Sequence, residues 1–442
     1  MAEGEINEYL VTATEVKALS FFDIDQYISA GIYQSQKVPL SVLQSALGGG
    51  GAFGISDATG TYTYYDTLTL AMAAAVSGEV IQVFADFVET GAVTITFKDG
   101  VSINGNGYTY TLNNSGTINA FEYLSSGNLS FNIHNFNVIR TGSITNNTTQ
   151  NCVVRLTTAT SGNIDLTGST FTNSGSGAGF ALVTKIHLTN GRAYSSSVWG
   201  AFAIFSFNVE AKLTDCKGFA TGAGFGIRCH SGGQIENCYG EADSGYGIFG
   251  TGIHSNCTGV SITGYGYQTT GKAYNCVGKS TSGNGFDITN ATEVVGCTGI
   301  SVSGVGFRHS NKTTYNCTGI SSSNVGYYMA AQAVTAYNLM SKSTSNRSMN
   351  TSINQSIYGG LIISEWNDFA GFGIYGTYNV ATVILNCTFI LANSSAPYLQ
   401  IFTNAAQAVS TRGNTYKGGG AFNPNITQAI VTTEDSQGNI FL

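Results

Sequence analysis

Charged residues are scarce in this chain. Of its 442 residues only 10% are Asp, Glu, Lys or Arg, and the formal net charge is −7, whereas about a quarter of an average soluble domain is charged. Lys and Arg form no clusters, which argues against nucleic acid as a partner. No run of about 18 apolar residues occurs, so the sequence predicts no membrane insertion. The opening segment MAEGEINEYL is acidic and has no apolar core, so no secretory signal is predicted.

Proline is nearly absent as well, with 3 residues, and glycine does not recur at every third position. Collagen needs both features, so that class is excluded. Disordered chains are poor in aromatic residues, and the 12% of Phe, Trp and Tyr found here excludes that class too. Glycine is abundant, with 57 residues, and so are Ser, Thr and Asn. This composition favours many short strands joined by tight turns.

A repeat dominates the middle of the chain. Six units, 19 to 22 residues apart, each carry one cysteine: Cys216, Cys238, Cys257, Cys276, Cys297 and Cys317. In each unit a Gly follows two residues after the Cys, and a G-x-G motif with an aromatic neighbour comes later. Paired helices need a longer period, and the Leu pattern of leucine-rich repeats is missing. The repeat therefore predicts an all-β fold, a right-handed parallel β-helix whose coils stack at about 4.8 Å.

Stacking places equivalent residues of successive coils in columns. The Asn before each Cys is expected to form one such column in a turn, because Asn tolerates the left-handed conformation. The aromatic residue after G-x-G is expected to form an interior row. Alternation along the strands places Cys, Gly and Ser inside and Lys217, Glu241 and Lys279 outside. Val and Ile of the later coils then form an apolar exterior patch, which burial between subunits would explain. The alternative is that the inward and outward positions are exchanged, which would place that patch in the core.

The nine cysteines are an odd number and include no CxxC motif. No Cys or His pair has the spacing of a zinc site. We therefore expect buried, reduced thiols, no metal and no cofactor. Reduced thiols and the missing secretory signal are typical of synthesis in a reducing cytoplasm.

Four regions are expected along the chain. Residues 1–50 are predicted to form a partly helical head, because Val16, Leu19, Phe22 and Ile24 have helical spacing and 37–47 is a second amphipathic segment. Residues 51–60 are predicted to be a Gly-rich joint. Residues 61–345 are expected to form the β-helix, which starts with a capping helix within 65–78. For 346–442 the sequence leaves two alternatives open, irregular β coils or a separate C-terminal β cap.

The segment 64–107 resembles a known family. Its helical stretch followed by Gly100, Ile103, Gly105 and Gly107 is similar to the entry of pectin-lyase-like β-helices in phage tailspikes, tail fibres and adhesins. The segments VTATEVKALSFFDIDQYISAG and KVPLSVLQSALGGG resemble short virion-anchoring heads of phage tail proteins. The resemblance covers about 1–345 and implies a homotrimer in the virion. It also implies contact with other tail or baseplate proteins through 1–50 and recognition of a bacterial surface polysaccharide.

The resemblance also raises the question of catalysis, since some such β-helices cleave polysaccharide. Glycoside hydrolysis needs two carboxylates about 5–9.5 Å apart. Asp287 and Arg308 follow the aromatic row in successive coils and are the best lyase-like cluster, together with His309. Alternation places His309 on the opposite face, and a surface ion pair with a satisfied His is the alternative. Asp243 and Glu241 are the nearest carboxylate pair within one coil, with a solvated edge as the alternative.

A second candidate cluster is Glu365, Trp366 and Asp368. A Trp ring can stack on a sugar face, and carboxylates accept hydrogen bonds from hydroxyls, so this group could bind a glycan. The alternative is that Trp366 belongs to the core or to an interface.

Scarcity of charge favours binding over catalysis, because an active groove normally collects several carboxylates or cations. We therefore expect a structural virion appendage, a tail fibre or tailspike that attaches to a bacterial surface glycan. The first alternative is a polysaccharide depolymerase, a hydrolase or lyase, on the same β-helix. The second is a bacterial surface adhesin, which the missing secretory signal disfavours.

Overall fold

The computed structural model describes residues 51–441 with short gaps and, before them, the two strands at 21–28 and 32–39. The gaps are residues 114–118, 124–126, 142–151, 158–160, 176, 183–184, 197–199, 205–209, 231, 290, 292, 311–312, 331–333, 352–354, 366–371, 377–381, 392–398, 404–406, 418–428 and 433–439. The single helix of the described residues is α3 (Leu68–Ala74). It is not long enough to cross a membrane.

The N-terminal region contains a β-hairpin where the sequence predicts a helix. β1 (Phe21–Ile28) pairs antiparallel with β2 (Ile32–Pro39). The helical prediction is therefore wrong from Phe21 onward. Apolar and polar residues alternate strictly over Phe22–Asp25, and this period of two is the strand pattern that outweighs the helical spacing. Of the second predicted amphipathic segment, 37–39 belongs to β2 and the rest lies outside the described residues.

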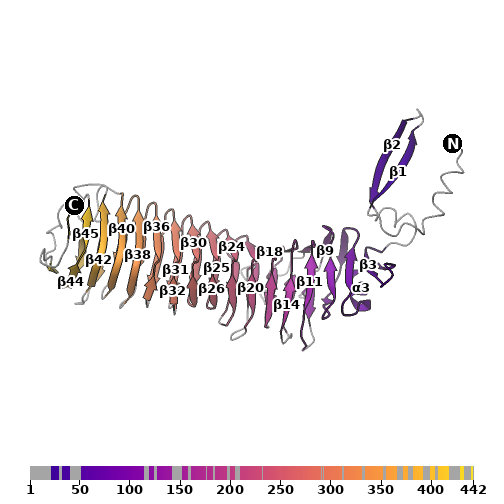
Figure 1. Cartoon of the computed structure of the whole chain (residues 1–442), viewed down its shortest axis with the longest axis horizontal. Coiled ribbons are helices and arrows are strands. Elements are labelled where there is room, and N and C mark those ends of the chain that lie inside the picture. Colours follow the sequence, from indigo (N-terminus) through magenta and orange to yellow (C-terminus); the bar gives the residue numbers. More distant parts are fainter. Residues whose placement is uncertain are drawn as a thin grey trace.

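The rod begins at β3 (Phe53–Ser56), inside the segment predicted to be a joint. β3 pairs antiparallel with β4 (Tyr62–Tyr65) and with β5 (Val80–Val83), and Phe53 is completely buried. The prediction of a joint is therefore wrong at β3, because FGIS supplies apolar side chains that the first coil buries. α3 lies where the sequence predicts a capping helix, at the N-terminal end of the rod (Figure 1). Thr67 caps α3 by accepting a hydrogen bond from the amide of Leu70 at 3.2 Å.

The rest of the chain is a β-solenoid in which equivalent strands of successive coils pair in parallel. The strands run as stacked rows along a rod, and the two ends of the rod lie far apart (Figure 1). The all-β, parallel β-helix prediction is confirmed. Each coil contributes strands to three faces, which we call face 1, face 2 and face 3.

Face 1 is a 14-stranded sheet. It consists of β7 (Ile95–Thr96), β10 (Phe121–Tyr123), β13 (Val154–Leu156), β16 (Phe180–Leu182), β19 (Phe202–Ile204), β22 (Phe225–Cys229), β25 (Tyr246–Gly250), β28 (Tyr267–Thr269), β31 (Phe286–Thr289), β34 (Phe307–Ser310), β37 (Tyr327–Met329), β39 (Met349–Thr351), β41 (Phe372–Gly376) and β43 (Leu399–Thr403).

Face 2 starts at β5. It continues with β8 (Ser102–Asn104), β11 (Phe131–His134), β14 (Gly162–Asp165), β17 (Ile186–Thr189), β20 (Lys212–Thr214), β23 (Gln234–Glu236), β26 (Ile253–Ser255), β29 (Lys272–Tyr274), β32 (Glu293–Val295), β35 (Thr313–Tyr315), the first parts of β38 (Thr335–Ser343), β40 (Ser356–Ser364) and β42 (Thr382–Leu391), then β44 (Gln407–Arg412) and β46 (Ala429–Thr432).

Face 3 follows face 2 in each coil. It consists of β6 (Phe87–Thr90), β9 (Thr109–Asn113), β12 (Asn137–Thr141), β15 (Thr170–Asn173), β18 (Arg192–Ser195), β21 (Lys217–Ala220), β24 (Tyr239–Ala242), β27 (Thr258–Ser261), β30 (Val277–Ser280), β33 (Thr298–Ser301), β36 (Thr318–Ser321), the second parts of β38, β40 and β42, then β45 (Thr415–Lys417) and β47 (Ile440–Phe441).

Parallel pairing therefore continues beyond residue 346. β40 pairs with β38, β42 with β40, and β47 with β45, all in parallel. Of the two alternatives for 346–442, the described strands thus form further coils of the same β-helix.

A column of left-handed residues separates faces 2 and 3. Its members have φ between 50° and 59°: Asn135, Asn190, Asp215, Asn237, Asn256, Asn275, Asn316, Asn338 and Asn386. Four coils place a glycine there instead, Gly168, Gly296, Gly359 and Gly413. The side-chain amide of Asn338 donates to the side-chain oxygen of Asn316 at 3.3 Å. The predicted Asn column is therefore present, and it turns the chain sharply between the two faces.

The interior is narrow where faces 3 and 1 meet. A Cβ atom on Gly240 would lie 2.2 Å from the carbonyl oxygen of Gly247, and the same close approach recurs coil after coil. Ser280 stabilises this corner through two hydrogen bonds. Its hydroxyl donates to the Gly264 carbonyl at 2.6 Å and accepts from the Gly283 amide at 2.9 Å. Ser261, Ser301, Ser321 and Ser343 make the equivalent bonds.

The predicted interior columns are present. Rings stack face to face from Tyr267 to Phe286, Phe307 and Tyr327, with centroids 4.7 to 5.1 Å apart. All nine cysteines are buried, and none forms a disulfide. Burial raises the pKa of the Cys317 thiol to about 12, so the thiol stays protonated. Lys217, Glu241 and Lys279 are exposed, so the prediction that Cys, Gly and Ser point inward is confirmed.

Candidate functional site

Asp287 and Arg308 form the ion pair that the sequence predicts. They lie opposite each other on β31 and β34, and the Arg308 Nη1 to Asp287 Oδ2 distance is 3.3 Å. The Asp287 side chain is completely buried and also accepts from Asn284 Nδ2 at 2.8 Å and Thr289 Oγ1 at 3.0 Å. These bonds occupy its carboxylate, so the geometry favours a structural role on face 1.

His309 lies on the opposite side of β34, inside the β-helix. Its ring is completely buried, and Nδ1 lies 3.5 Å from Thr314 Oγ1 and 3.4 Å from the Tyr327 hydroxyl. The structure therefore does not bring His309 together with the Asp287–Arg308 pair, as alternation predicts.

The other sequence candidates lie apart from this pair. Glu241 and Asp243 are exposed. The Tyr239 hydroxyl donates to Glu241 at 2.7 Å, and the Gly222 amide donates to Asp243 at 3.4 Å. Glu365 forms an exposed ion pair with Lys342 at 2.6 Å. Trp366 and Asp368 lie outside the described residues, so their proposed part in glycan binding stays a prediction.

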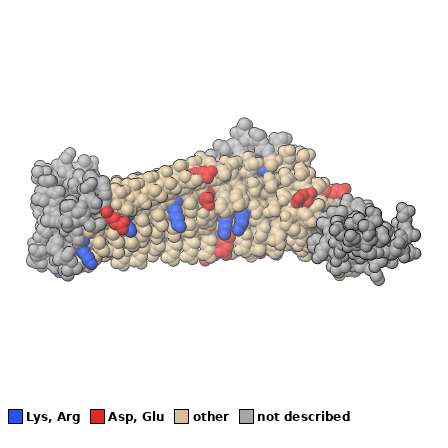
Figure 2. All heavy atoms as spheres, turned by 90° about the horizontal axis from the view of Figure 1, so that it is seen from above, with Lys and Arg blue, Asp and Glu red and all other residues tan. Residues whose placement is uncertain are grey.

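Sequence reasoning missed a polar region on faces 2 and 3. Eleven charged residues fall from Asp165 to Asp243 inclusive, and Figure 2 shows that charged side chains are sparse and scattered along the rod. We call the part of this region on β14, β15, β17, β18, β20, β21 and β23, with the turns between them, the polar belt. Eleven charged residues in 79 are only slightly above the 10% of the whole chain, so the sequence carries little signal for this region.

Two shallow clefts flank face 2 in the polar belt. The first has a volume of about 370 Å³ and is lined by Gly168, Ser169, Thr170, Asn190, Gly191, Arg192, Asp215 and Lys217. The second has a volume of about 360 Å³ and is lined by Asn128, Ser130, Ser161, Gly162, Asn163, Lys185, His187 and Glu210. Both open on the outer surface of the rod, where a long polymer has access.

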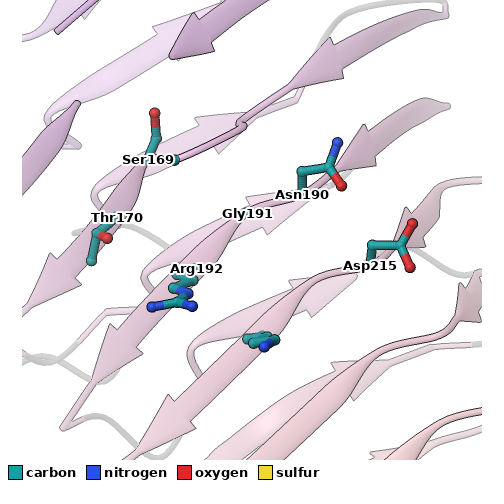
Figure 3. Close-up of a pocket in the computed structure, with 8 residues that line it drawn as sticks. Ser169, Thr170, Asn190, Gly191, Arg192 and Asp215 are labelled. Atoms are coloured by element: carbon teal, nitrogen blue, oxygen red, sulfur yellow. The ribbon is translucent and has the colours of Figure 1, made fainter. Parts of the chain in front are cut away.

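The stacking of coils explains how the first cleft is assembled. Thr170, Arg192 and Lys217 are the first residues of β15, β18 and β21, which pair in register. Asn190 and Asp215 come from the left-handed column in the turn before β18 and β21. Figure 3 shows Thr170 and Arg192 on neighbouring strands, with Asn190 and Asp215 beside them across the cleft. One cleft is thus built from three successive coils.

A hydrogen-bond network on face 2 surrounds Asp165 and reaches Asn190 of the first cleft. The Asp165 carboxylate accepts from Asn190 Nδ2 at 2.9 Å and from Thr189 Oγ1 at 3.2 Å, and it lies 3.2 Å from His134 Nε2. Burial opposes ionisation, but the bonds from Asn190, Thr167, His134 and Thr189 outweigh it and hold the pKa of Asp165 below its usual value. Asp165 is therefore ionised at neutral pH.

His187 lies beside this network on β17. Its Nε2 is 2.9 Å from Thr214 Oγ1. Burial and the positive charge of Lys212 lower the pKa of His187, against a smaller opposing effect of Glu236. The ring is therefore neutral at pH 7 and can serve as a hydrogen-bonding group. Lys212 itself is paired with Glu236 at 2.6 Å, and Lys185 with Glu210 at 3.1 Å.

The polar belt offers hydroxyl, amide, imidazole, carboxylate and cationic groups on one outer surface. Such groups bind the hydroxyls and acidic substituents of saccharides. No group of three or more His, Cys, Asp or Glu side chains in the described part of the chain is arranged to hold a metal ion.

No protein-family model matches the chain, and no curated protein matches it in sequence. Among solved structures, it is similar to tailspike protein 3 of bacteriophage CBA120, with 10% identity over 100% of this chain and 68% of that one and a TM-score of 0.32. It is also similar to the A-module of a mannuronan C-5 epimerase of Azotobacter vinelandii (10% identity, 85% and 93% coverage, TM-score 0.26) and to the receptor binding domain of the Siphovirus 9NA tailspike (13% identity, 83% and 76% coverage, TM-score 0.24).

Proposed function

We propose that this protein is a bacteriophage tailspike or tail fibre that attaches the virion to a bacterial surface polysaccharide. The observation that carries the proposal is the polar belt, where a charge-poor β-helical rod has two open clefts lined by hydroxyl, amide, carboxylate and cationic groups. A rod surface made of stacked coils repeats every 4.8 Å or so, and a linear polysaccharide can lie across several coils. The resemblance of 64–107 to tailspike and tail fibre β-helices supports the same conclusion.

Binding without cleavage is the expected activity. The purified full-length chain, incubated with capsular polysaccharides and lipopolysaccharides from a panel of bacteria, should bind at least one of them in a surface-immobilised assay. The same mixtures should release neither reducing ends nor unsaturated uronides. Release of either product would show a depolymerase, which is the alternative function, and absence of binding to the whole panel would contradict glycan attachment.

We also propose that the rod assembles as a homotrimer. An outer apolar band, which consists of Val260, Ile300 and Ile320 on face 3 and of Ile262 and Val302 in the turns that follow, runs along the later coils. Ile262 is 54% exposed and Val302 is 52% exposed. Lys279 lies between Val260 and Ile300 in the strand register and interrupts the band with one charged side chain. Exposed apolar side chains gathered on one surface are typical of an interface between subunits. A second and third copy of the chain would cover it.

The assembly is tested by light scattering after gel filtration. We expect a mass three times the 46.3 kDa of one chain. The double substitution Ile262→Glu with Val302→Glu should yield monomers, because it places two charges in the buried interface. Thr263→Glu, at the exposed neighbour of Ile262, is the matched control and should leave the trimer intact. A monomeric wild-type chain would contradict the proposal.

Residues 1–50 are proposed to attach the rod to other tail or baseplate proteins. Within this region the described strands β1 and β2 form a two-stranded sheet of their own, separate from the sheets of the rod. The proposed location of the protein is therefore the virion.

A further inference from the structure

We propose that the first cleft of the polar belt binds an acidic sugar, a saccharide residue that carries a carboxylate, through Arg192 and Lys217. This inference rests on the proposed attachment to polysaccharide and names the chemical class of the glycan. It follows from which cations of the belt are already paired, from what else lines the cleft, and from the aromatic wall beside it.

The two cations of the first cleft are free for a ligand. Lys185 and Lys212 each pair with a glutamate, whereas neither Arg192 nor Lys217 has a salt-bridge partner among the described residues. Both side chains are exposed, and they occupy paired positions on β18 and β21. Adjacent strands are about 4.8 Å apart, so one carboxylate can contact both cations.

The remaining lining of the cleft fits a sugar rather than a bare polyanion. Asp215 lies in the same cleft and is exposed. Its carboxylate repels dense negative charge but accepts hydrogen bonds from hydroxyl groups. Thr170 and Asn190 add a hydroxyl and an amide that can bond to further hydroxyls. The cleft therefore matches a single carboxylate surrounded by hydroxyl groups.

An aromatic wall borders the two cations on face 3. Tyr194 and Phe219 lie two residues after Arg192 and Lys217 on the same strands and therefore point to the same side. Their rings stack on each other with centroids 4.7 Å apart, and both residues are half-buried. This mutual stacking holds the rings in place, so they give the cleft a fixed aromatic border beside the two cations.

The test compares acidic polysaccharides with their neutral forms. Polygalacturonate, alginate, hyaluronate and polysialic acid are each offered in native and carboxyl-reduced form to the full-length protein, and Kd is measured at low and physiological salt. At least one native polymer should bind, and carboxyl reduction should weaken its binding at least tenfold, the loss expected when charge-assisted hydrogen bonds are removed. Added salt should weaken it further, because the attraction is screened.

Variants assign the binding to the cleft. Arg192→Ala and Lys217→Ala should each weaken binding of the native polymer about tenfold, with unchanged thermal unfolding, because both side chains are exposed. Lys417→Ala, which removes an exposed lysine of β45, is the control and should bind as the wild type does. Binding that ignores carboxyl reduction, or that survives both cleft substitutions, would overturn the acidic-sugar inference while leaving glycan attachment standing. Failure to bind these polymers and the bacterial panel alike would overturn both.

Discussion

Replacing Gly278 by Ala should prevent the chain from folding into a stable rod. A Cβ atom at this position would lie 2.1 Å from the carbonyl oxygen of Gly285 and 2.8 Å from Cβ of Tyr267. The carbonyl cannot retreat, because Gly285 is itself packed against the backbone of Ile300 in the next coil. We expect a loss of more than about 4 kcal/mol in the free energy of unfolding, which places the substitution among the most damaging kind. Soluble yield and the midpoint of thermal unfolding measure it.

Gly222→Ala is the matched control for this prediction. Gly222 has a φ of +82° but nothing lies within 4 Å of its added Cβ atom. Its cost is therefore limited to the backbone strain of a left-handed residue, about 1–2 kcal/mol. A Gly278→Ala protein that unfolds within 2 °C or so of the control would contradict the close approach of faces 3 and 1.

The rod should lose stability in acid through His254, and His254→Ile should remove that loss. His254 lies inside β26, is completely buried, and neither ring nitrogen has a hydrogen-bond partner among the described residues. Burial lowers its pKa to about 4, against a smaller opposing effect of Cys276. An unfolded His titrates near 6.5. The His254 ring is therefore neutral in the folded chain down to about pH 4, whereas in the unfolded chain it binds a proton below about pH 6.5.

The direction and the size of the pH effect on stability follow from this difference in pKa between the folded and the unfolded chain. The stability that the neutral ring provides is complete above pH 6.5 or so and is lost as the pH falls toward 4, by about 3 kcal/mol in total. Ile is the natural replacement, because Ile235 occupies the same position one coil earlier. Denaturant unfolding of both proteins at pH 7 and pH 4 isolates the effect, since carboxylates such as Asp165 titrate in both. Equal acid sensitivity of the two proteins would contradict the prediction.

The regular part of the fold was predictable because each of its columns repeats a chemical requirement. The left-handed turn requires Asn, Asp or Gly, the close approach of two faces requires Gly, and the interior row accepts rings that stack. Six copies of one unit show these requirements in the sequence. The first coil shows no such repetition, so FGIS at β3 was predicted as a joint although its Phe53 is buried. At β1, helical spacing and strand alternation coexist, and the single copy offers no way to choose.

The candidate site was less predictable, for a related reason. Thr170, Arg192 and Lys217 are 22 and 25 residues apart, in coils where the cysteine motif is weak or absent. Only the register of β15, β18 and β21 brings them into one cleft. The Asp287–Arg308 pair was found in advance because it lies in the regular coils, where counting positions gives the register. The burial of Asp287 and its hydrogen bonds from Asn284 and Thr289 depend on side-chain directions that the repeat does not encode.

The reversal of one strand at the start of the rod prevents end-to-end polymerisation there. In a solenoid of in-register parallel strands, the first coil has an edge of unpaired backbone N–H and C=O groups. Such an edge is a template for another chain. Here β3 lies antiparallel against β5, and α3 packs Leu68, Ala71 and Met72 against the same end. An incoming rod that offers a parallel strand to β5 therefore meets hydrogen bonds that are already made.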